Sequence, residues 1–282
     1  MTPKDLIAKH IRSIGKPEEV AKIKSRGISG KAAVEFVVGA KGMLSDGQFL
    51  CVSDGRNLGM RMVFKDVNYP GEYFAYNGKE TSVGYITPGQ RSPVGDFVFR
   101  YNAFVKEGLL GGVLSTAWPL LKPYEEQLEM QYKQEKIGDI SYHVLEYGTS
   151  KVFGDVKVKL YFDPKTFRHV RTEYRVRHKN EMSALPGITD SRQQSVNQSP
   201  SGRPNDRQPT GTIMQNQADS IYVLTEKFDN FGNVNGLVLP QDYYLDYSVE
   251  GQSAIVVRWA IMLEHWINNS PKIDQSFFAA QK

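Results

Sequence analysis

Apolar residues alternate with other residue types through much of the chain after Gly27, and this period of two most constrains the fold. Leu58, Met60, Met62 and Phe64 would share one face of a strand, because successive side chains of a strand point to opposite faces. Dipeptides that tolerate tight turns recur between such runs. We therefore predict an antiparallel β meander, with hairpin turns at Asp46-Gly47, Asp54-Gly55 and Asn77-Gly78.

The apolar face of a later strand pair predicts the register of its hairpin. Every second residue of 156–162 is apolar, and the apolar faces of the two strands meet if residues 163–167 form the loop, which pairs Leu160 with Val170. Lys159 would then lie directly opposite Arg171. A solvated strand face is one interpretation, and a surface for an anionic partner, either a phospholipid surface or an acidic protein patch, is the other. The basic residues of this predicted partner surface are Lys157, Lys159, Arg171 and Arg175.

A second hairpin near the C-terminus follows the same reasoning. Apolar side chains occupy every second position of residues 243–249 and 255–259. Their apolar faces meet if residues 250–252 form a three-residue turn, which would pair Tyr243 with Trp259.

Helices are predicted at the N-terminus and in the middle of the chain. Thr2 can cap an N-terminal helix that ends near Gly15, and a short helix over residues 17–23 follows. Asp96 can cap a third helix, which would place Phe97, Tyr101 and Phe104 on one stripe. The run that comes next, residues 109–121, carries no charge and must be buried.

One stretch has the composition of a polar insertion. No aromatic residue occurs between Arg175 and Ile221, and residues 180–219 are rich in Ser, Gln, Asn, Pro and Arg. Such a segment buries too little apolar surface to offset its ordering entropy. We predict a disordered insertion, either a tolerated surface loop or a partner-binding arm, within a single domain over residues 1–282.

Composition and motifs argue against several classes of function. The net charge of +4 disfavours a nucleic-acid binder, and the one cysteine, Cys51, excludes an internal disulfide or a multi-cysteine metal site. No apolar run reaches the about 18 residues of a membrane-spanning helix. The motifs H-E-x-x-H, G-x-S-x-G and G-x-G-x-x-G are absent. We expect no metal, no cofactor and no catalysis; an enzyme built on His143 or His169 with a carboxylate is a remaining alternative.

Surplus apolar surface is the strongest functional signal. The flexible side chains of Met60 and Met62, the aromatic helix and the uncharged run each fit an ordinary packed core, but together they favour a lipid-binding cavity between a sheet and its helices. The residues predicted to line this cavity are Met60, Met62, Phe64, Phe97, Tyr101, Phe104, Leu109, Leu110, Leu114, Trp118, Tyr243, Leu245 and Trp259.

The order of the predicted elements and four short motifs carry a family resemblance. An amphipathic helix precedes the meander, an apolar helical insertion interrupts it, and the motifs are YNGK at 76–79, LYFDPKT at 160–166, GLVLP at 236–240 and PKIDQSFF at 271–278. In these features the chain resembles the outer-membrane lipoprotein-sorting family, the LolA-like lipoprotein carriers.

The resemblance implies a fold and a function. The fold is mainly β (α+β): an incomplete antiparallel β-barrel, or half-barrel, with helices covering its concave face. The function is a periplasmic carrier of lipoproteins or other acylated lipids, whose signal peptide has been removed. Expected partners are an acylated lipoprotein or lipid and envelope transport proteins, with transient contact to a membrane surface.

Two hypotheses differ in the state of the interior. In the first, the chain holds acyl chains in an apolar cavity, and residues 96–121 act as a moving cover with hinges at Gly108, Gly111 and Gly112. In the second, the same fold is a non-carrying interaction or sensor module of the envelope, and its interior is packed. The volume and lining of any cavity between sheet and helices would discriminate between them.

Overall fold

The computed structural model describes residues 1–39, 41–55, 57–116, 118–121, 130–147, 154–178, 220–250 and 254–279. The insertion predicted at 180–219 lies outside the described residues. Strands dominate, and most of the helices are short. The strands are β1 (Ser25–Val38), β2 (Gly42–Asp54), β3 (Asn57–Val63), β4 (Gly71–Tyr76), β5 (Thr81–Val83), β6 (Met130–Ile137), β7 (Ile140–Tyr147), β8 (Val156–Phe162), β9 (His169–His178), β10 (Ser220–Val234), β11 (Leu237–Glu250) and β12 (Ile255–Asn268). The helices are α1 (Pro3–Ile14), α2 (Pro17–Ala21), α3 (Pro93–Arg100), α4 (Ala103–Lys106), η1 (Leu110–Val113), α5 (Trp118–Leu121) and η2 (Gln275–Phe278).

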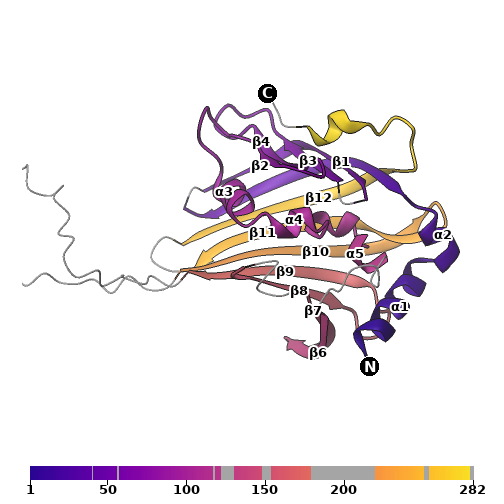
Figure 1. The fold of residues 1–282 in the computed structure, drawn as a ribbon. Coiled ribbons are helices and arrows are strands. Elements are labelled where there is room, and N and C mark those ends of the chain that lie inside the picture. The colour runs from indigo at the N-terminus through magenta and orange to yellow at the C-terminus, as the bar shows by residue number, and fades with distance from the viewer. Residues whose placement is uncertain are drawn as a thin grey trace, which may run out of the picture.

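The strands form one antiparallel sheet in the order β5-β4-β3-β2-β1-β12-β11-β10-β9-β8-β7-β6. The sheet is open, because β5 and β6 end it on its two sides. Figure 1 shows α3, α4 and α5 lying across one face of the curved sheet, with α1 towards one end of the strands. The predicted fold class, an incomplete antiparallel barrel with helices on its concave face, is confirmed.

The core lies between this face and the helices. Its buried side chains come from both layers, for example Leu6 of α1, Phe104 of α4 and Trp259 of β12. The uncharged run contributes Leu109, Leu110 and Leu114, each buried, so the expectation that this run is buried is confirmed for these residues. Period-two alternation thus produced one apolar sheet face, and the helices cover it.

Both predicted N-terminal helices form, and the first has the expected cap. Thr2 Oγ1 accepts the N–H of Asp5 at 3.2 Å, and the Asp5 carboxylate accepts the N–H of Thr2 at 2.9 Å. The prediction that Asp96 caps the middle helix is wrong. Ser92 caps α3, because Pro93 occupies the first turn and Ser92 Oγ accepts the N–H of Gly95 at 2.9 Å.

The predicted register of the first hairpin is wrong by two residues. Leu160 pairs with Thr172 instead of Val170, because the loop is one residue longer than predicted and a bulge adds a second residue. The parity is nevertheless correct, so the apolar faces of β8 and β9 do meet. A consequence is that Lys159 lies opposite Glu173, not opposite Arg171.

The second hairpin shows the same error. Trp259 pairs with Leu245, while Tyr243 pairs with Ile261. Turns at Asp54-Gly55 and Asn77-Gly78 are confirmed, but Asp46-Gly47 lies inside β2. An added Cβ on Gly47 would meet the Phe64 ring at 2.3 Å. That glycine therefore serves close packing rather than a turn.

Candidate functional site

The uncharged run crosses the concave face of the sheet with its backbone close to the strands. Residues 109–116, which we call the glycine-rich segment, are all buried. Gly111 and Gly112 have φ angles of 73° and 48°, a region that favours glycine. A Cβ added to Gly112 would lie 3.2 Å from the Phe228 ring and 3.4 Å from His169. The two glycines therefore allow an approach that larger residues would prevent.

The carboxylate of Glu226 on β10 holds the glycine-rich segment to two tyrosines. Oε1 accepts the N–H of Gly111 at 2.6 Å and the hydroxyl of Tyr243 at 2.7 Å, and Oε2 accepts the hydroxyl of Tyr174 at 2.8 Å. Burial raises the pKa of Glu226 to about 7, although all three hydrogen bonds act to lower it. This one side chain thus satisfies three donors inside an apolar core.

Arg26 on β1 anchors the same segment a little further along. Its Nη1 donates to the carbonyl oxygen of Val113 at 2.8 Å, and its Nε donates to Asn268 Oδ1 at 3.2 Å. The guanidinium lies over the Trp266 ring, 5.7 Å from the ring centroid. Burial lowers the pKa of Arg26 to about 10, so the group remains a cation at neutral pH.

Two buried histidines lie beside each other in the core, and one of them, His169, contacts the glycine-rich segment. His169 Nδ1 lies 3.2 Å from the carbonyl oxygen of Ser115, and its Nε2 lies 2.9 Å from Thr172 Oγ1. His10 of α1 places Nδ1 3.1 Å from the carbonyl oxygen of Phe167. Burial lowers the pKa of His10 to about 3 and that of His169 to about 4. Both rings are therefore neutral at pH 7.

Most of the predicted cavity residues lie side by side in the packed core. All except Tyr101 and Trp118 are buried members of one apolar cluster, and Tyr101 packs against it. Trp118 packs against a smaller cluster, and its Nε1 donates to Ser53 Oγ at 2.7 Å. Phe97 and Tyr101 border a cavity of about 120 Å³. Whether the set binds lipid stays a prediction.

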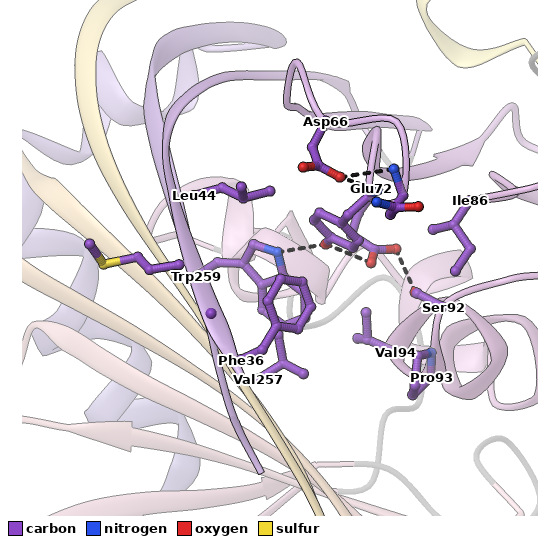
Figure 2. A pocket seen from close by; sticks show the side chains of 14 residues that line it. Phe36, Leu44, Asp66, Glu72, Ile86, Ser92, Pro93, Val94, Val257 and Trp259 are labelled. Atoms are coloured by element: carbon purple, nitrogen blue, oxygen red, sulfur yellow. Dashed lines mark hydrogen bonds between the residues drawn. The ribbon is translucent and has the colours of Figure 1, made fainter. Parts of the chain in front are cut away.

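A larger cavity, of about 370 Å³, lies between the start of α3, the loop before β4 and one end of β1, β2 and β12. We call it the Trp259 pocket, and Figure 2 shows its side chains. Of the predicted set, it contains Trp259. Its lining residues are Phe36, Gly42, Met43, Leu44, Asp66, Asn68, Tyr69, Glu72, Ile86, Ser92, Pro93, Val94, Val257 and Trp259.

A chain of hydrogen bonds forms one wall of the Trp259 pocket (Figure 2). Trp259 Nε1 donates to Tyr69 Oη at 2.9 Å, and Tyr69 in turn donates to Glu72 Oε1 at 2.8 Å. Ser92 Oγ donates to Glu72 Oε2 at 2.8 Å. Burial raises the pKa of Glu72 to about 7, against the effect of its two hydrogen bonds. The wall therefore links β12 and β4 to the start of α3.

Neither buried carboxylate was predicted from the sequence. Glu226 lies two residues from Leu224 and from Phe228, so strand alternation places it on the apolar face. Glu72 directly precedes the aromatic pair Tyr73-Phe74. A carboxylate at an apolar position of a strand is the signal that could have identified them.

The four residues of the predicted partner surface divide into two pairs. Lys159 Nζ lies 2.8 Å from Glu135 Oε2, and an Arg171 Nη lies 2.9 Å from Glu173 Oε2. Lys157 instead lies directly opposite Arg175 in the ladder between β8 and β9.

Lys157 and Arg175 also line a polar groove of about 580 Å³. Glu146 and Asp155 line the same groove, so it presents charges of both signs. This part of the sheet is therefore not a purely cationic surface. An anionic partner at Lys157 and Arg175 stays a prediction.

Groups that could bind a metal ion are not gathered in the described part of the chain. Among the described residues, no three side chains of the metal-binding types His, Cys, Asp and Glu come together. Burial raises the pKa of the Cys51 thiol to about 12, which leaves it protonated and unreactive. His143 Nδ1 lies 3.0 Å from the hydroxyl of Tyr132. None of the helices described here has the length and apolar character needed to cross a membrane.

Comparisons with known proteins return structures but no sequence family. No protein-family model matches the chain, and no curated protein matches it. The chain is similar to the structure of a LolA superfamily protein from Nitrosomonas europaea, with 14% identity, coverage of 99% of this chain and 98% of that one, and a TM-score of 0.45. A DUF1329 family protein from Desulfovibrio piger gives 9% identity, coverage of 99% and 98%, and a TM-score of 0.41. The lipoprotein LppX from Mycobacterium tuberculosis gives 14% identity, coverage of 61% of this chain and 88% of that one, and a TM-score of 0.23. The LolA superfamily is the family that the sequence motifs resemble.

Proposed function

We propose that the protein is a periplasmic carrier or binding protein for lipoproteins or other acylated lipids, and that it holds acyl chains by burial, without catalysis. The Trp259 pocket is the observation that carries this proposal. Its volume, about 370 Å³, falls within the roughly 300–1,000 Å³ that small-molecule sites occupy. Each methylene group moved from water into such a pocket contributes on the order of 0.8 kcal/mol.

Apolar side chains at the rim of the Trp259 pocket support the same proposal. Met43, which lines the pocket, is 69% exposed, and Val67, between the lining residues Asp66 and Asn68, is 92% exposed. Water-facing apolar groups beside an apolar pocket offer an arriving acyl chain its first contact.

The glycine-rich segment would act as part of a cover that moves when a larger cargo enters. In the structure, Glu226, Arg26 and His169 hold this segment against the sheet through its backbone atoms. Movement about Gly108, Gly111 and Gly112 would break these contacts and expose the apolar residues beneath. The predicted cavity residues would then become the wall of an enlarged site.

Native mass spectrometry of gently purified protein tests the carrier function. We expect co-purified lipid, or binding of an added dodecanoylated peptide. Ile86→Trp should abolish binding, because Ile86 lines the Trp259 pocket and indole would fill it. Ile140→Trp is the matched control, since Ile140 is 47% exposed on β7. Protein that is always empty and binds no added lipid or lipopeptide would overturn the proposal.

The packed interior favours a second candidate, an envelope interaction or sensor module that carries no cargo. Most residues predicted to line the cavity already fill each other's space in the core. This module predicts no lipid binding, and it predicts that reversing the charge of both Lys157 and Arg175 weakens crosslinking to an envelope partner. Crosslinking that is unaffected by this reversal, together with lipid binding in the experiment above, would reject it.

A further inference from the structure

The charge of the Trp259 pocket has one sign. Glu72 and Asp66 both line it, and its described lining includes no lysine, arginine or histidine. Arg91 is the basic residue next to Ser92, but its guanidinium lies over the Phe99 ring, 3.8 Å from the centroid, and donates to the Tyr85 hydroxyl at 3.1 Å. A carboxylate or phosphate group inside the pocket would therefore meet like charges without a cation to offset them.

Glu72 retains capacity to accept hydrogen bonds. An ionised carboxylate offers about four lone-pair sites, and the hydroxyls of Tyr69 and Ser92 occupy one on each oxygen. Neither bond comes from a cation, and no ion pair to Glu72 occurs in the described part of the chain. Buried carboxylates are usually paired with a cation. Glu72 can therefore accept a further hydrogen bond from a positively charged donor in the pocket.

Aromatic rings beside Glu72 fit the same kind of group. Phe36 and Tyr69 lie edge to face with centroids 5.1 Å apart, and Trp259 hydrogen-bonds to Tyr69 in the same wall. Aromatic faces attract ammonium groups through the ring quadrupole. Opposite them in Figure 2, Ile86 and Val94 provide an apolar wall for a hydrocarbon chain.

We infer that the Trp259 pocket binds an alkyl or acyl chain that carries a primary ammonium group, and that Glu72 accepts a hydrogen bond from this group. The pocket discriminates against chains that end in a carboxylate or phosphate. This inference rests on the proposed function, because it names the class of cargo that the pocket selects. The ammonium lies between the carboxylate and the aromatic rings, and the chain runs along the apolar wall.

Calorimetric titration at pH 8 tests the inference, with dodecylamine and dodecanoate below their micelle concentrations and dodecanol below its solubility limit. A primary amine remains charged at this pH, as lysine does with its pKa of about 10.4. We expect dodecylamine to bind at least about tenfold more tightly than dodecanol, the ratio that one charge-assisted hydrogen bond gives. Dodecanoate should bind more weakly than dodecanol. The affinities for N-dodecanoyl-lysine amide and for dodecylamine are then compared. Tighter binding of the first indicates an acylated peptide as the source of the ammonium group, and tighter binding of the second indicates an aminolipid.

Substitutions test whether Glu72 causes the preference for dodecylamine over dodecanol. Glu72→Gln should make the affinities for dodecylamine and dodecanol equal, while Glu80→Gln, the same change at an exposed site, should preserve the tenfold ratio. Asp66→Asn provides a second variant if Glu72→Gln does not fold. Dodecanoate binding as tightly as dodecylamine to the unmodified protein would overturn the inference and leave the carrier function standing. Absence of binding by all the probes, lipopeptide included, would overturn the carrier function itself.

Discussion

The backbone N–H of Gly111 donates to Glu226 Oε1 over 2.6 Å, and this contact joins the glycine-rich segment to the middle of the sheet. Glu226→Gln should lower the free energy of unfolding by about 1–3 kcal/mol, because an amide oxygen cannot replace two carboxylate oxygens for three buried donors. Urea unfolding measures the change. Glu80→Gln is exposed and should have almost no effect; equal effects of the two variants would contradict this role of Glu226.

Gly112→Ala should destabilise the protein more than Gly138→Ala. Both glycines have positive φ, 48° and 59°, so each variant carries a backbone cost of about 1–2 kcal/mol. A Cβ at Gly112 also meets Phe228 at 3.2 Å, whereas nothing lies within 4 Å of a Cβ at Gly138. Chemical unfolding measures the free energy of unfolding of both variants. The difference between their losses is the cost of holding the segment away from the sheet. Identical losses would show that the close approach is unimportant.

The buried histidines predict a loss of stability in acid. Burial lowers the pKa of His10 to about 3 from the ordinary 6.5, so its contribution is present above pH 6.5 and is lost as the pH falls towards 3. At pH 5 the loss is about 2 kcal/mol. Burial raises the pKa of Glu226 to about 7, so that carboxyl group contributes most below pH 4.5 and its contribution is lost as the pH rises through 7.

A variant without His10 separates the contribution of this histidine to the pH dependence of stability from that of the buried carboxyl groups. The difference in unfolding free energy between the unmodified protein and His10→Gln should shrink by about 2 kcal/mol between pH 7.5 and pH 5. His265→Gln, at an exposed position of β12, is the matched control for replacing a histidine by glutamine. A difference for His10→Gln that is constant across this range would contradict the burial of a neutral ring.

The strand pattern predicted the fold more accurately than it predicted the pairing. Alternation assigns each side chain to a face, and a shift of two residues leaves that assignment unchanged. Parity alone therefore could not distinguish Leu160–Val170 from the observed Leu160–Thr172 pair. The bulge and the longer loop that decide between them are local backbone features without a clear signal in the residues.

The candidate site was less predictable from the sequence. Trp259 was chosen for its apolar strand face, but its partner Tyr69 comes from the loop before β4 and connects it to Glu72 of β4. Hydrogen bonds between distant segments leave no periodic pattern. Large apolar side chains predict burial equally well in a packed core and around a cavity. The packing of α3 and of the loop before β4 against the sheet decides where space remains.

The same charge reversal at two positions of β8 should have opposite effects. Lys157 faces Arg175, so Lys157→Glu replaces a like-charge pair by a cross-strand ion pair and should stabilise the protein by about 0.2–1 kcal/mol. Lys159 faces Glu173 and contacts Glu135 at 2.8 Å, so Lys159→Glu should cost at least about 1 kcal/mol. Urea unfolding at low salt measures both effects, and added salt should reduce them because these side chains are partly exposed. Had the predicted register been correct, Lys159 would face Arg171 and its replacement by glutamate would be the stabilising change. The sign of this one substitution therefore distinguishes the two registers.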